Sequence, residues 1–158
     1  MDAGRRDALK AGGGATLLTL LAAAGWLAPG DALAQGAWNQ AAFETKTLDE
    51  TVKALGGTAP AQSKDIAFVS TPDIAENGAV VPIGVASSIP NTEAIAILVE
   101  KNPNMLAAIF DIPAGTEPTI TTRIKMGQSS NVYALVRAGG KYHVASKEIK
   151  VTLGGCGG

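Results

Sequence analysis

The feature that most constrains the fold is a series of short apolar or alternating stretches divided by turn-forming residues. The stretches lie at 64–70, 79–87, 94–101, 105–112, 118–126, 131–138 and 141–153. The turns between them include Glu76-Asn77-Gly78, Asn102-Pro103-Asn104, Pro113-Ala114-Gly115, Gln128-Ser129-Ser130 and Gly139-Gly140. About seven short strands in roughly 100 residues are typical of an immunoglobulin-like sandwich. We therefore predict an all-β fold, from which no function follows.

A short helix is predicted ahead of the strands. Thr47 and Glu50 have the spacing of a capping box, and Gly56-Gly57 ends the segment after about three turns. The apolar residues of this segment fall on one face: Leu48, Val52 and Leu55.

Pro82 lies in the uncharged segment 79–86, and proline has no N–H to donate to a ladder. The segment is therefore predicted to be an edge strand or to carry a bulge. An uncharged edge is normally covered, either by another protein or by the chain's own N-terminal helix. The sequence leaves both alternatives open.

The N-terminus has the pattern of an export signal. Arg5, Arg6 and Lys10 precede an uncharged run that is apolar over 15–28. The paired arginines resemble the twin-arginine type of signal. Ala32-Leu33-Ala34 offers small residues for cleavage before Gln35, so we predict a signal peptide over 1–34 and a domain over 35–153. A membrane anchor is the alternative, but the apolar run is shorter than the ~20 residues that span a bilayer.

The only cysteine, Cys156, lies in a C-terminal tail whose other residues are Gly154, Gly155, Gly157 and Gly158. Glycines have no side chains to pack around a buried sulfur, and they leave the backbone free. We predict that 154–158 form a flexible arm whose thiol lies about 10 Å beyond Leu153. An unpaired cysteine in an exported protein indicates an intermolecular link or a reactive free thiol.

Other kinds of site find little support in the sequence. His143 is the single histidine, so a cysteine–histidine zinc site is excluded, and its place in an alternating stretch indicates a structural or surface role. The carboxylates are scattered, and no glycine-rich phosphate loop precedes a helix. The net charge of −1 argues against nucleic acid as a partner. We predict no metal, no cofactor and no catalytic residue.

Four segments together resemble the SoxY family, the sulfur carriers of the thiosulfate-oxidising Sox system. They are the terminal 154–158, Glu76–Ile83, Val99–Asn104 and Lys147–Val151. The resemblance implies a periplasmic immunoglobulin-like protein that pairs with SoxZ as a heterodimer and is not itself an enzyme. It also implies that Cys156 is joined to thiosulfate by the haem-containing SoxAX. The manganese-dependent hydrolase SoxB and the sulfane dehydrogenase SoxCD would then act on the adduct.

Three hypotheses follow for Cys156. The leading one is a carrier thiol that holds sulfur species as persulfide and thiosulfonate adducts. The second is an exported assembly module whose cysteine only forms an intermolecular disulfide. The third, an autonomous thiol enzyme, is the weakest, because the chain has no second thiol and the tail itself offers no base.

Overall fold

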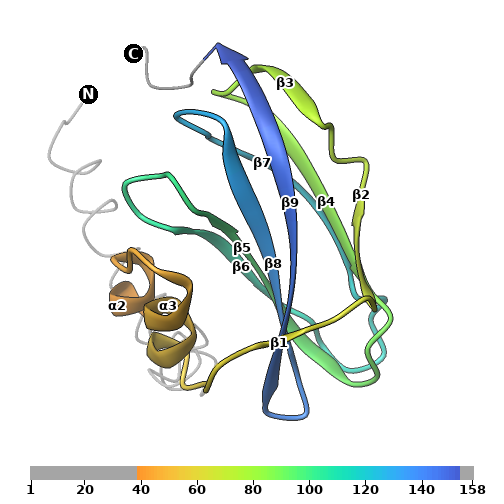
Figure 1. The fold of residues 1–158 in the computed structure, drawn as a ribbon. Coiled ribbons are helices and arrows are strands. Elements are labelled where there is room, and N and C mark those ends of the chain that lie inside the picture. The colour runs from red at the N-terminus through yellow and green to blue at the C-terminus, as the bar shows by residue number, and fades with distance from the viewer. Residues whose placement is uncertain (1–38, 154–158) are drawn as a thin grey trace, which may run out of the picture. The chain divides into compact units, whose positions relative to one another are not determined.

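The computed structural model describes residues 39–153 of the 158-residue chain. Two short helices come first, and strands dominate the rest of this range (Figure 1). The elements are α2 (Gln40–Phe43), α3 (Leu48–Ala54), β1 (Ala61–Gln62), β2 (Ile66–Val69), β3 (Ile74–Asn77), β4 (Val81–Ser87), β5 (Thr92–Val99), β6 (Leu106–Asp111), β7 (Thr119–Ile124), β8 (Ser130–Ala138) and β9 (Lys141–Leu153).

The strands form two facing sheets. The smaller sheet has the order β2-β4-β7, and the larger has the order β1-β9-β8-β5-β6, with β3 as a further partner of β9. The chain changes sheet between β2, which pairs with β4, and β3, which pairs with β9. The predicted all-β sandwich is confirmed.

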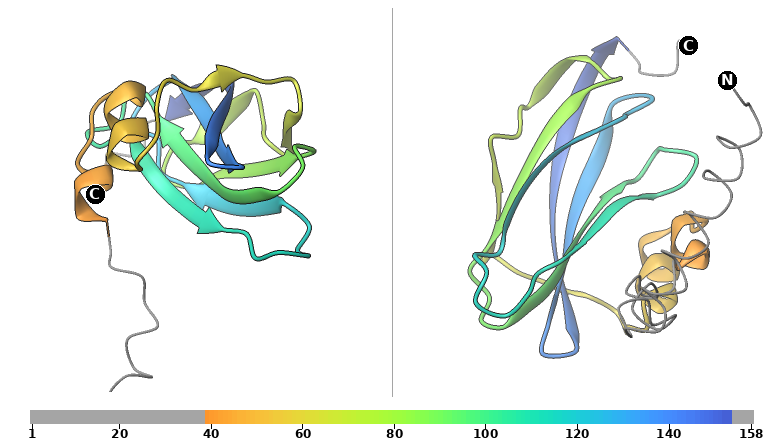
Figure 2. Two further views of the ribbon diagram at one scale, coloured as in Figure 1. Left: turned by 90° about the horizontal axis from the view of Figure 1, so that it is seen from below. Right: turned by 180° about the vertical axis from the view of Figure 1, so that it is seen from behind.

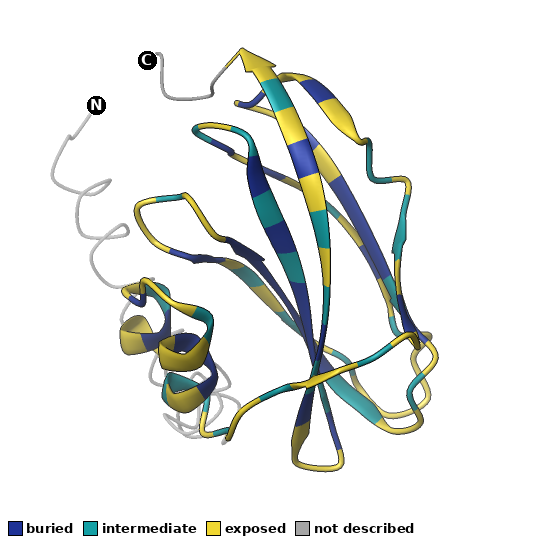
Figure 3. Cartoon of the chain, viewed as in Figure 1, coloured by how far each residue is buried: buried dark blue, intermediate teal, exposed yellow. Residues whose placement is uncertain are grey.

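The alternation of side chains along β5 explains why its sequence is apolar on both faces. Ile95, Ile97 and Val99 pack in the core between the sheets, whereas Ala96 and Leu98 belong to a second buried cluster. In Figure 3 the middle of β8 is likewise buried, while β9 alternates between buried and exposed residues. The larger sheet is therefore a middle layer.

The helices supply the third layer. Val52 of α3 is buried against the outer face of the larger sheet, in the cluster that holds Leu98, Leu135 and Val144 (Figure 2). The capping box is confirmed, because Thr47 accepts a bond from the Glu50 N–H while the Glu50 carboxylate accepts one from the Thr47 N–H. The predicted length was wrong: α3 has seven residues, about two turns, and Gly56 follows it with φ of 81°. Helix α2 was not predicted.

Two strands were missed. Strand β1 and strand β3 both pair in parallel with β9, at Ala61↔His143 and Ile74↔Lys150. Strand β3 also takes in Asn77, which the sequence had placed in a turn. Each of these strands is short and has a partner far along the chain, so no local pattern marks it.

The predicted edge at Pro82 was wrong as well. Strand β4 lies between β2 and β7, and no register shift interrupts either pairing. The Gly84 N–H points to the β2 side, where it donates to the Thr71 hydroxyl, so the nitrogen of Pro82 points to that side too. Strand β2 has already ended at Val69, opposite Gly84. The missing donor therefore costs no ladder bond, and the helices cover the larger sheet instead.

Candidate functional site

The predicted site residues Cys156, Gly154, Gly155, Gly157 and Gly158 lie outside residues 39–153. The structure describes the strand that leads to them. Strand β9 ends at Leu153, at one end of the sandwich (Figure 1). The position of Leu153 at this end determines where the tail that contains the thiol begins.

On one side, β3 holds the last residues of β9. The Gly78 N–H donates to the Leu153 carbonyl at 2.7 Å, and the Thr152 hydroxyl donates to the Glu76 carbonyl at 3.0 Å. Gly78 is itself fixed, because its carbonyl accepts a bond from the Met126 N–H at 2.7 Å. Strand β9 is therefore bonded on this side up to its final residue.

On the other side, a serine hydroxyl continues the ladder. The pairing of β8 with β9 ends at Ser130↔Ile149. Beyond that pair, the Val151 N–H donates to Ser129 Oγ at 2.9 Å. The strand that precedes the tail is thus supported on both sides to within two residues of Leu153.

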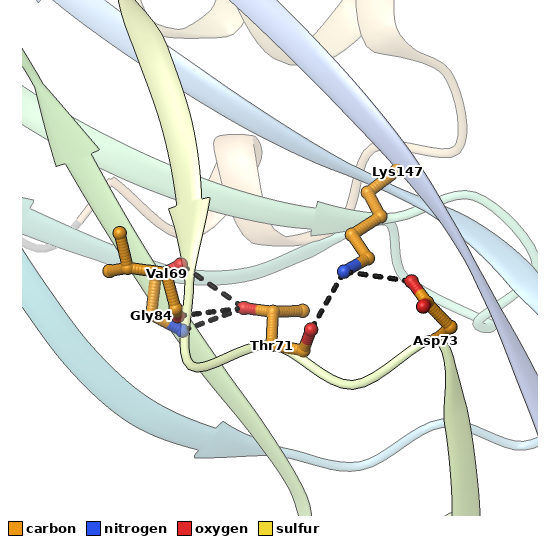
Figure 4. A network of polar contacts seen from close by, with 5 residues as sticks. All are labelled: Val69, Thr71, Asp73, Gly84 and Lys147. Atoms are coloured by element: carbon orange, nitrogen blue, oxygen red, sulfur yellow. Dashed lines mark hydrogen bonds and ion pairs between the residues drawn. The ribbon is translucent and has the colours of Figure 1, made fainter.

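Lys147 of β9 binds the connection between β2 and β3, where the chain passes from one sheet to the other. Lys147 Nζ donates to the Thr71 carbonyl at 2.7 Å and lies 3.0 Å from Asp73 Oδ1 (Figure 4). The Asp73 carbonyl accepts a further bond from the Lys150 N–H at 2.9 Å. These contacts set β3 beside the end of β9, where it can hold Leu153.

The Thr71 hydroxyl bonds the same β2–β3 connection to β4. It accepts from the Gly84 N–H at 3.0 Å, and its one hydrogen can reach the carbonyl of Val69 or of Gly84, each at 3.1 Å (Figure 4). A Cβ added at Gly84 would lie 2.1 Å from the Val69 carbonyl oxygen. Only glycine fits where β2 leaves the smaller sheet.

Three large apolar side chains on or near the last residues of β3 and β9 are exposed. Leu153, Ile74 and Val80 are 71%, 59% and 52% exposed. Asn77 is the register partner of Leu153, and its carbonyl accepts a bond from the Val80 N–H at 3.3 Å. We call Leu153, Ile74 and Val80 the tail-root group.

Acid–base chemistry is not assembled at this end. His143 precedes Leu153 by ten positions on β9, which is about 33 Å along an extended strand. Within residues 39–153, no group of three or more His, Cys, Asp or Glu side chains is arranged to hold a metal ion. The Asp and Glu residues of 39–153 are all exposed except Glu93, which is partly buried and lies 3.0 Å from Arg137 in an ion pair.

A tyrosine–carboxylate contact on the larger sheet was not predicted. Glu100 accepts hydrogen bonds from Asn131 Nδ2 at 2.9 Å and from the Tyr133 hydroxyl at 3.4 Å. Burial, and then the charge of Glu100, raises the pKa of Tyr133. The phenol therefore stays protonated at neutral pH and acts as a donor, not as a base.

A cavity of about 500 Å³ lies at the other end of the sandwich, between the β4–β5 and β6–β7 connections. Its polar lining includes Ser88, Asn91 and Thr116. Strand β9 reaches this end only where it begins, at Lys141, which pairs with Ala138. The cavity is therefore remote from Leu153.

Comparison with known proteins decides the family. The family model described as sulfur oxidation protein SoxY matches residues 52–156, a span that includes β9 and Cys156. The chain belongs to the SoxY family. A similar solved structure is that of the sulfur carrier protein SoxY from Chlorobium limicola f thiosulfatophilum, with 38% identity and a TM-score of 0.60. The match covers 67% of this chain and 96% of that one.

Weaker similarities add nothing to this assignment. A chain in a structure concerning T cell activation by the superantigen toxic shock syndrome toxin-1 is 15% identical, with a TM-score of 0.37. That match covers 54% of this SoxY chain and 97% of the other chain. No curated protein is similar enough to count as a match.

The family assignment bears out several predictions. The SoxY resemblance is confirmed, and with it a protein of sulfur oxidation that is a carrier and not an enzyme. The predicted signal peptide, 1–34, lies outside residues 39–153, and within that range none of the helices has the length and hydropathy to cross a bilayer. The role of Cys156, the named partners and the export route remain predictions.

Proposed function

We propose that this SoxY protein carries sulfur on Cys156, bound covalently to the thiol, and presents it to other enzymes of the Sox system. The observation that carries this proposal is the support of β9 ahead of the single cysteine, on both sides as far as Val151 and on the β3 side as far as Leu153. The family match, which extends to residue 156, supports it further.

Loading requires an oxidation. A Cys156 thiolate and thiosulfate form a sulfur–sulfur bond, and the two electrons released pass to the haem-containing SoxAX. Hydrolysis by SoxB then adds water to the terminal sulfonate, releases sulfate and two protons, and leaves a persulfide on Cys156. SoxCD would oxidise the remaining sulfane sulfur. We assign these oxidation and hydrolysis steps to its partners.

The length and composition of the tail suit delivery of the thiol to several partner sites. The three residues from Leu153 to Cys156 extend about 10 Å at 3.3 to 3.6 Å each. Gly154, Gly155, Gly157 and Gly158 add no side-chain bulk, so the thiol can enter narrow clefts of different shape. The covalent bond keeps each intermediate on the carrier between partners. The tail-root group would meet the rim of each cleft.

The other assignments belong to the same proposal. Residues 1–34 are a twin-arginine-type signal peptide, 35–153 are the SoxY domain, and 154–158 are the substrate-carrying arm. After cleavage the protein works in the periplasm, without a membrane anchor, as a heterodimer with SoxZ. It binds no cofactor of its own.

Replacing the thiol tests the proposal. The Cys156→Ser variant is expected to lose all loading by thiosulfate in the reconstituted system while its melting temperature stays unchanged, because the tail follows the last strand. Thr121→Ala, at an exposed position of edge strand β7, is a control that leaves both β9 and the thiol intact, so loading should persist. A Cys156→Ser protein that still carried substrate sulfur would refute the proposal. Permanent disulfide dimers that never load would favour an assembly module.

A further inference from the structure

Asn77 is the only asparagine in the sequence that a glycine follows. It is the last residue of β3, which lies beside the end of β9 (Figure 1). An asparagine in this context is prone to deamidation, because the backbone nitrogen of the next residue can attack the side-chain amide carbon. Glycine has no side chain to hinder the attack. Asn77 is exposed to water and Gly78 is buried, so the chemistry of the pair depends on how the two residues are held.

Three hydrogen bonds hold the pair in an unreactive arrangement. The Gly78 N–H donates to the Leu153 carbonyl at 2.7 Å. The side-chain oxygen of Asn77 accepts from the Ala79 N–H at 2.8 Å, and its carbonyl accepts from the Val80 N–H at 3.3 Å. A peptide nitrogen attacks only after it loses its proton, and the bond to Leu153 stabilises the protonated form. The nucleophile is therefore suppressed while this bond is intact.

Backbone geometry couples the reaction to the end of β9. Asn77 is a strand residue paired with Leu153, so its ψ lies in the extended range. In that range the Gly78 nitrogen is not eclipsed with Cβ of Asn77, as closure of a five-membered ring requires. A large rotation about ψ would be needed, and it would swing the Gly78 N–H away from Leu153. Ring closure and the bond between Gly78 and Leu153 therefore exclude each other.

We propose that Asn77 is a deamidation site that reacts only when β3 releases Leu153. The Gly78 nitrogen then gives its proton to a base from the solvent and attacks Cγ of Asn77. The bond from Cγ to the side-chain nitrogen breaks, and that nitrogen takes up a proton and leaves as ammonia. Water opens the resulting succinimide at either carbonyl, which leaves aspartate or isoaspartate at position 77. No oxidation or reduction takes place.

Isoaspartate would make the release permanent. It routes the main chain through the side chain of residue 77, which adds one methylene ahead of Gly78. The Gly78 N–H can then no longer meet the Leu153 carbonyl in the register of β3. Either product also places a negative charge beside the exposed Leu153 and Val80. The consequence for sulfur delivery rests on the proposed function, whereas the deamidation itself does not.

Peptide mapping by mass spectrometry tests the site. The chain carries Cys156→Ser, which excludes disulfides, and is held at mildly alkaline pH either folded or unfolded in urea. We expect aspartate and isoaspartate at position 77 to form at least about tenfold more slowly in the folded protein. Asn77→Gln should give neither product on the same time scale, because its ring would have six members. Asn104, which is exposed and followed by Met105, is an internal control that should react far more slowly than Asn77 in the unfolded chain.

Two variants separate local release from general destabilisation. Thr71→Val loosens the connection ahead of β3, so deamidation and exchange of the Gly78 N–H should rise by the same factor, because both require the same opening. Thr47→Ala removes the helix cap of α3 and should change neither rate. Deamidation of the folded chain at the unfolded rate would overturn the proposal. So would a Thr71→Val chain in which Gly78 exchange rises and deamidation does not.

Discussion

Removing the Thr71 hydroxyl should loosen the junction that sets β3 beside the end of β9. Thr71→Val keeps the shape of the side chain but deletes the oxygen that accepts the Gly84 N–H at 3.0 Å. Gly84 is buried, and a Cβ there would lie within 2.1 Å of the Val69 carbonyl. The added methyl of valine would occupy the place of the hydroxyl, so the Gly84 N–H would lose its acceptor without gaining a water.

The expected cost follows from that buried donor. An unsatisfied buried N–H costs about 1 to 3 kcal/mol. We expect a loss of about 2 kcal/mol in the free energy of unfolding, or roughly 8 °C in Tm for a domain of this size. Thr71→Ser retains the hydroxyl and should lose less than about 0.5 kcal/mol. The carbonyl of Thr71 still accepts from Lys147, so the effect is specific to the hydroxyl.

Urea unfolding and amide exchange would measure the two consequences. Thr71→Val should lower the urea midpoint and speed exchange of the Gly78 N–H, which donates to Leu153. Thr121→Val, at an exposed threonine on β7, is the control and should leave both unchanged. Equal losses for Thr71→Val and Thr71→Ser, or an unaltered Gly78 exchange rate, would refute the reasoning.

Four further predictions concern the tail, the end of β9 and the helix. Deleting Gly155 shortens the reach by about 3.5 Å, which should lower turnover by partner enzymes about 100-fold or more at constant Tm; unchanged turnover in the reconstituted pathway would contradict a fixed reach. Val80→Ser combined with Leu153→Ser should raise the KM of partner enzymes for the loaded carrier severalfold, whereas an unchanged KM would exclude the tail-root group as a contact. Thr47→Ala should cost about 1 kcal/mol of stability by urea unfolding, through loss of the helix cap. Hydrogen bonds from the backbone, the Lys46 N–H foremost, lower the pKa of Glu50, so its stabilisation is present above the ordinary glutamate pKa and is lost as pH falls through the lowered value. Stability that is equally sensitive to acid in Glu50→Gln would contradict this last assignment.

Local signals predicted local structure well. The bounds of β9 agree with the predicted stretch 141–153, because Gly139 and Gly140 both take positive φ in the turn ahead of it. The α3 cap was found for the same reason, since Thr47 and Glu50 satisfy each other within one turn. The candidate thiol was also visible, because a lone cysteine among glycines needs no knowledge of the fold.

Distant contacts were not visible in the sequence. Strand β3 forms because contacts of Lys147 and of the Asp73 carbonyl hold it against β9. The two strands are separated in sequence by more than half the length of the domain. Pro82 suggested an edge, but it lies in a central strand at a position where the neighbouring strand has already ended. The support of Leu153 by Gly78 follows from the pairing of β3 with β9. It appears only when the two sheets are assembled.

The most direct test of the carrier function is the intact mass of the mature protein taken from cells that are oxidising thiosulfate, before and after reduction, with any adduct mapped to a peptide. The account predicts a reducible sulfur or thiosulfonate adduct on the peptide that contains Cys156. An unmodified thiol, or only a plain disulfide dimer, under those conditions would contradict it.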